Sequence, residues 1–96
     1  MRDFQFARLV ALCTIAIVSS QSLVKAQYTE RELVRKGNSL YNDSLFVKAE
    51  EYYLRALDKN NSNSVALYNL GNAYLEQQKV HDALDHYKKV AKLLNI

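Results

Sequence analysis

Apolar residues recur at helical spacing along most of the chain. Residues three and four apart share one face of an α-helix, and this spacing is followed by Phe46, Ala49, Tyr53, Ala56 and Leu57. The chain has no Pro, and no stretch alternates between apolar and polar residues as a half-buried strand does. The pattern predicts an all-α fold with helices over about 29–41, 45–58, 64–77 and 80–94.

Short polar residues mark the ends of these helices. Thr29 and Glu32 stand three apart, as in a capping box that satisfies free amide groups at a helix start. Clusters of Asn, Asp and Ser predict turns at 42–44 and 60–64. Ser62 or Ser64 is the expected cap of the helix that follows the second turn.

The same pattern of residues occurs twice, 34 positions apart. The two copies are Leu33, Gly37, Ala49, Tyr53, Ala56 and Leu57, and then Leu67, Gly71, Ala83, Tyr87, Val90 and Ala91. Their two glycines are the only ones in the chain. Because Gly within a helix costs about 1 kcal/mol relative to Ala, two glycines at equivalent positions indicate a close approach between helices.

A 34-residue period of two helices is typical of the tetratricopeptide repeat. The second copy resembles that motif in Leu67-x2-Leu70-Gly71-x2-Tyr74 followed by Ala83-x3-Tyr87. The first copy departs from it at Lys36 and Leu40, and Asn61 and Asn95 stand where the motif closes with Pro. The resemblance implies an α-α superhelix of two helix-turn-helix units, 30–63 and 64–96, in a repeat domain over 27–96.

The first unit also looks like the exported repeat proteins of the Bacteroides aerotolerance operons. The segments that carry this narrower resemblance run from Arg35 to Tyr41 and from Ala49 to Tyr53. It implies a periplasmic or envelope-associated protein of a bacterium, in a larger assembly.

The first 26 residues have the order of a secretory signal peptide. Arg2 and Arg8 precede an apolar run over 9–18, and a polar stretch ends at Ala26. About ten apolar residues are too few to span a bilayer, which needs about 20. We expect cleavage after Ala26, or else after Ser20, and the alternative is a segment kept as an uncleaved membrane anchor. The only cysteine, Cys13, would leave with the signal.

The charge of the remaining chain is nearly balanced. Residues 1–26 hold three of the 13 basic residues and one of the 10 acidic residues. Basic and acidic residues alternate in the rest, which is typical of solvated helix faces, whereas nucleic-acid binding needs a basic stripe. We expect a protein or peptide partner, no nucleic acid, and membrane contact only through the signal segment before cleavage.

In tetratricopeptide proteins the first helix of each unit lines a concave groove that commonly holds a peptide or a partner protein. By that resemblance the groove includes Arg31, Val34, Val65 and Leu75, and the residues expected to bind the partner are Arg35, Asn38, Tyr41, Asn42, Tyr68, Asn69, Asn72 and Glu76. Asn pairs with both donors and acceptors of a peptide backbone, and Tyr offers an apolar face with a polar tip. One subclass clamps a carboxylate with asparagines at the positions of Asn38 and Asn69. Val34 replaces a basic residue of that clamp, so no clamp is predicted.

The sequence predicts no catalytic residue, metal or cofactor. His81 and His86 are five positions apart, about 140° around a helix, and so cannot share a metal. The chain after residue 26 has no nucleophile triad and no Gly-rich phosphate loop. Tyr52, Tyr53 and Tyr87 fit the apolar stripe of a core.

These features predict an exported protein-protein interaction module that binds a peptide or partner protein through its concave face. The alternative is a purely structural or self-assembling solenoid fragment with no ligand of its own. Stacked repeats bury a continuous core only with neighbours. The open side of the second unit is therefore expected to dock on another copy or on a partner, around Tyr74, Leu84, Leu94 and Ile96.

The order of charge, apolar run and Ala26 predicts a processed amino terminus. Mass spectrometry of the protein from its native compartment should find Gln27, or else Gln21, as the first residue. Recovery of only the full-length chain from the cytosol would contradict export.

Overall fold

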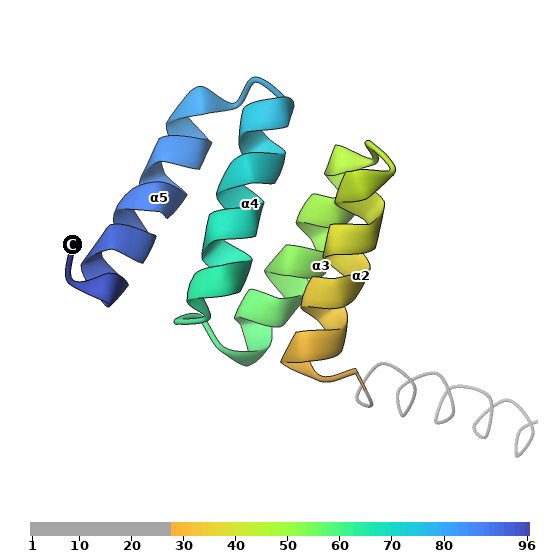
Figure 1. Cartoon of the computed structure of the whole chain (residues 1–96), viewed down its shortest axis with the longest axis horizontal. Coiled ribbons are helices and arrows are strands. Elements are labelled where there is room, and N and C mark those ends of the chain that lie inside the picture. The colour runs from red at the N-terminus through yellow and green to blue at the C-terminus, as the bar shows by residue number, and fades with distance from the viewer. Residues whose placement is uncertain (1–27) are drawn as a thin grey trace, which may run out of the picture.

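The computed structural model describes residues 28–96 as four helices that pack side by side in chain order (Figure 1). They are α2 (Glu30–Asn42), α3 (Phe46–Lys59), α4 (Ser64–Glu76) and α5 (Val80–Leu94), with no strand among the described residues. The predicted all-α fold of two helix-turn-helix units is confirmed. The predicted signal peptide, its two cleavage sites and Cys13 lie outside the described residues. None of the four described helices is long and apolar enough to cross a membrane.

The repeat extends to the ends of the helices. Thr29 and Glu32 form the predicted capping box, in which each backbone amide donates to the other side chain at 3.1 Å. The turn inside each unit contains one residue in the left-handed backbone conformation, Ser44 with a φ of 61° and Gln78 with a φ of 63°. These two residues occupy the same repeat position, so the two turns share one conformation.

The start of α4 differs from the prediction. Asn63 is the cap, and its Oδ1 accepts a hydrogen bond from the Ala66 amide at 3.0 Å. The prediction of Ser62 or Ser64 as the cap is wrong, because Ser64 is already the first residue of the helix. Ser62 belongs to the preceding turn, where its amide donates to Asn60 Oδ1 at 3.1 Å.

The main core joins the two units. Its buried residues come from α2, α3 and α4, and they are Leu33, Val34, Ala49, Tyr53, Ala56, Ala66, Leu70 and Ala73. Half of them are Ala, so α3 and α4 approach closely. Two expectations are corrected here: Val34 is only 8% exposed and is a core residue, and Tyr74 packs against this core instead of lying on the open side of the second unit.

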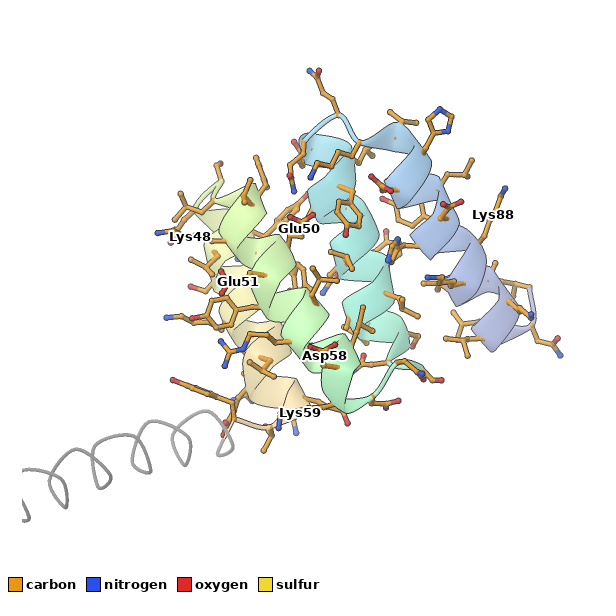
Figure 2. The ribbon with its side chains drawn as sticks, turned by 180° about the vertical axis from the view of Figure 1, so that it is seen from behind. Lys48, Glu50, Glu51, Asp58, Lys59 and Lys88 are labelled. Atoms are coloured by element: carbon orange, nitrogen blue, oxygen red, sulfur yellow. The ribbon has the colours of Figure 1, made fainter. Side chains whose placement is uncertain are left out.

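Polar contacts hold both ends of α4 against the first unit. At its start, Asn63 Nδ2 donates to Glu30 Oε2 at 3.0 Å. Just beyond its other end, Lys79 Nζ lies 3.6 Å from Glu50 Oε1, and Glu50 is on the side of α3 that faces α4 (Figure 2). Because Lys79 is well exposed, this ion pair adds little stability, but the two contacts join the ends of α4 to α2 and to α3.

A tyrosine ring lies directly on the glycine of each unit. A Cβ atom placed on Gly37 would be 2.5 Å from Tyr53 Cε1, and one placed on Gly71 would be 2.6 Å from Tyr87 Cε1. Carbon atoms that are not bonded do not approach so closely, so any larger residue would push the two helices of the unit apart. The close helix approach predicted from the two glycines is confirmed.

Alanine at these glycines should destabilise the fold, although Ala is the better helix former. For Gly37→Ala we expect the free energy of unfolding to fall by about 1–3 kcal/mol, since the buried Tyr53 ring has no room to move. Gly71→Ala should lose less, because Tyr87 is partly exposed and can shift. Chemical denaturation measures both, with Ser39→Ala on the exposed face of α2 as the control. A gain of stability in Gly37→Ala would contradict the contact.

Candidate functional site

Polar side chains from α2, α3 and α4 line a cavity of about 300 Å³ at the junction of the two units. Its residues are Asn38, Tyr41, Asn42, Tyr53, Asn69 and Asn72. Five of them are among the eight residues that the sequence assigned to partner binding. The sixth, Tyr53, was assigned to the core alone.

Asn38 is held in one orientation by two donors. The Tyr53 hydroxyl donates to Asn38 Oδ1 at 2.6 Å, and Asn69 Nδ2 donates to the same oxygen at 3.0 Å. These three residues come from three different helices. Because its oxygen is engaged within the molecule, Asn38 presents its amide nitrogen to a ligand as a donor.

The second unit repeats half of this arrangement. The Tyr87 hydroxyl donates to Asn72 Oδ1 in the same way. The Tyr68 ring lies beside Tyr87, with 5.7 Å between ring centroids and a 45° tilt. Near the carboxyl ends of α2 and α4, the Tyr41 hydroxyl lies 3.5 Å from Glu76 Oε1. Tyr41 of the pocket thus contacts Glu76, and Tyr68 and Tyr87 form a pair of rings in a separate hollow.

The other predicted binding residues lie around this pocket instead of in it. Arg35 lines a separate hollow of about 410 Å³ with Arg31, Val34 and Val65, toward the amino ends of α2 and α4. Tyr68 lines a third hollow of about 350 Å³ with Tyr87 and the end of α5. Glu76 is exposed and meets the pocket only through Tyr41.

Sequence reasoning missed the polar role of Tyr53 and Tyr87. Both belong to the apolar stripe, and Tyr53 is indeed 1% exposed, but each hydroxyl reaches an asparagine. The signal was present, because Asn38 and Asn72 each directly follow a glycine on which the Tyr ring lies. Tyr52 is only partly buried, and the Arg55 guanidinium lies 4.9 Å from its ring centroid.

Burial raises the pKa of two tyrosines of the pocket, which are neutral at pH 7 even without this shift. It raises the pKa of Tyr53 from 10.0 to about 12, with a smaller contribution from Tyr41. Burial first, and then the Glu76 carboxylate, raise the pKa of Tyr41. At neutral pH the pocket thus offers amides and neutral hydroxyls. Among residues 28–96, no group of three His, Cys, Asp or Glu side chains is placed to hold a metal ion.

Comparison with known proteins agrees with the repeat. Residues 64–94 match the family model of the tetratricopeptide repeat, so the second unit is such a repeat. Over 89 residues the chain is 35% identical to Tetratricopeptide repeat protein 17 of Rattus norvegicus, covering 90% of this chain and 7% of the relative. The human protein of the same name is 34% identical over 89 residues, with 90% of this chain and 8% of that relative covered.

The chain thus spans less than a tenth of the length of these relatives. The matches confirm the resemblance to tetratricopeptide repeat proteins. They give no support to the narrower resemblance to the aerotolerance operon proteins.

Removal of the Tyr53 hydroxyl should change stability in a pH-dependent way. The folded state raises the pKa of Tyr53, so this group contributes stability that is complete below pH 10.0 and is lost as the pH rises toward about 12. Tyr53→Phe should lower the free energy of unfolding at neutral pH by about 1 kcal/mol and flatten its fall above pH 10.0.

Urea denaturation over a pH series measures both effects. Tyr87→Phe is the matched variant, and it should flatten the fall less because Tyr87 is less buried. If the two variants kept the wild-type slope, the Tyr53 hydroxyl would not be held as described.

Proposed function

We propose that the chain is a protein-protein interaction module that binds an extended peptide segment in the pocket around Asn38. Tetratricopeptide repeats generally mediate contacts between proteins. The observation that carries the proposal is the fixed orientation of Asn38, whose oxygen is engaged by Tyr53 and Asn69. An amide held in this way is ready for a ligand before the ligand arrives.

The chemistry of the pocket suits a peptide backbone. An extended peptide exposes one N–H and one C=O group at each residue other than Pro, and the pocket offers uncharged amides that can pair with either. A cavity of about 300 Å³ lies at the small end of ligand sites. The pocket is therefore suited to a few residues of an extended chain and not to a folded domain.

Exposed side chains on both sides of the pocket enlarge the surface. Tyr68 is 53% exposed, and tyrosines often carry a large share of the energy at protein interfaces. Arg35 and Glu76, both exposed, add one charge of each sign. We propose that these three residues select among peptides, while the asparagines hold the backbone that all peptides share.

We also propose that the module works outside the cytoplasm. The support is the order of charge and hydropathy over residues 1–26, which ends at Ala26. Location in a bacterial envelope stays a prediction that rests on the sequence of the first unit.

Loss of two exposed residues beside the pocket should weaken peptide binding without unfolding the protein. Asn42→Ala with Tyr68→Ala removes one amide and one ring, and both residues are exposed. With peptides selected on the full chain from a displayed random library, we expect binding at least about tenfold weaker. The thermal unfolding temperature should be nearly unchanged.

The matched control is Lys48→Ala with Glu51→Ala, which lie on α3 away from α4 (Figure 2). Binding should be unaffected in this pair. An equal loss in both pairs, or a library that yields no peptide, would contradict the proposed site.

A further inference from the structure

The interface between the two units shows which residues allow one unit to pack on the next. We compare it with the exposed side of α2 and with the exposed side of α5. In α4, the residues that pack on the first unit include Ala66, Leu70 and Ala73, each 0% exposed. They form a stripe at spacings of four and three, with two small residues around one Leu. This small-Leu-small stripe lets α4 lie close to α3.

We call the exposed side of α2 the front of the molecule and the exposed side of α5 its back. At the front, α2 carries polar residues in place of that stripe. The positions equivalent to Ala66, Leu70 and Ala73 are occupied by Glu32, Lys36 and Ser39. All three are exposed. Within the part of the chain that the structure describes, this side of the first unit is thus polar and exposed.

At the back of the molecule, α5 carries apolar residues that nothing among the described residues covers. Of the four described helices, only α4 lies beside α5 (Figure 1). The α5 outer face consists of Leu84, Tyr87, Ala91 and Leu94, whose equivalents in the first unit are Glu50, Tyr53, Leu57 and Asn60. In the first unit, Glu50 pairs with Lys79, Tyr53 and Leu57 belong to or pack against the core shared with α4, and Asn60 directly follows α3. Leu84 is 47% exposed where the first unit has Glu50, so this end is more apolar than the interface it repeats.

Residues at equivalent positions of the two units differ in exposure, and the difference shows which surface a following helix would cover. Val34 is 8% exposed beneath α4, whereas its equivalent Tyr68 is 53% exposed. Tyr53 is buried, and its equivalent Tyr87 is only partly so. Tyr68 and Tyr87 together line an open hollow with Val90, Ala91 and Ile96. The exposed area is thus the area that a following helix would cover.

We propose that the α5 outer face is a docking surface for a helix with a small-Leu-small stripe like that of Ala66, Leu70 and Ala73, the first helix of a further repeat unit. The proposal rests on continuity with the interface between α3 and α4. The α5 outer face repeats the α3 side of that interface, but no further helix follows it among the described residues. A second copy stacked front to back would instead bring Lys36 and Glu32 against apolar side chains, which is unfavourable without partners.

The test supplies the missing stripe on the chain itself. A donor chain carries Glu32→Ala, Lys36→Leu and Ser39→Ala, which give α2 the stripe of α4, together with Leu84→Glu to block its own back. The donor is titrated into the wild-type full chain, and calorimetry and light scattering monitor binding and mass. We expect the donor to bind and to form a one-to-one complex that does not grow further.

Two controls make the result specific. A donor with Lys48→Leu, Glu51→Ala and Leu84→Glu exchanges the same two kinds of charged residue for Leu and Ala on exposed positions of α3 (Figure 2) and should not bind. A receptor with Leu84→Glu should bind the donor at least about tenfold more weakly. In the interface between the two units, Glu50 at the equivalent position pairs with Lys79. The donor has Leu45 in place of that lysine, so the new carboxylate would be buried without a partner. Because Glu32→Ala removes one capping contact, a donor that keeps Glu32 and changes only Lys36, Ser39 and Leu84 is measured beside it, with circular dichroism of both.

Binding of the donor no tighter than that of the control would overturn the proposal. Equal binding to the Leu84→Glu receptor would overturn it as well. A wild-type dimer that Leu84→Glu dissolves would show that a second copy, back to back, is the occupant instead.

Discussion

The contact between a tyrosine ring and a glycine determines how each unit is built. Because Gly37 has no side chain, α3 lies close enough to α2 for the Tyr53 ring to cover that glycine. The same closeness brings the Tyr53 hydroxyl to Asn38, the next residue along α2. One side chain therefore fills the core and orients an amide of the pocket. A wider separation of the helices would detach the hydroxyl from the asparagine.

The helices, the repeat and the glycine contact could be predicted because each leaves a local or periodic signal in the sequence. The capping box of Thr29 and Glu32 is a pattern of two residues, and the glycines stand out because they are unfavourable inside helices. The hydrogen bonds of the pocket leave a weaker signal, which is only that Asn38 and Asn72 each directly follow one of these glycines. They depend on the direction of a ring across two helices, and an apolar stripe does not reveal where the Tyr53 hydroxyl ends.

The errors at Val34 and Tyr74 share one physical cause, which is that equivalent positions in two repeat units do not have the same neighbours. Val34 was placed in the open groove, but α4 covers it. Tyr74 was placed on the open side of the second unit, but it packs toward the core shared with α3. Both depend on the neighbouring unit, whereas the sequence pattern describes a unit by itself.

The same dependence connects the pocket to the open end of the molecule. In the first unit, Asn38 is held by its own Tyr and by Asn69 of the following helix. In the second unit, Asn72 accepts from Tyr87, and Asn69 has no equivalent beyond α5 among the described residues. A helix docked on the α5 outer face would stand where α4 stands in the first unit, within reach of Asn72. It would therefore cover Tyr87, and a helix with an asparagine at the position of Asn69 would complete a second asparagine site next to the first.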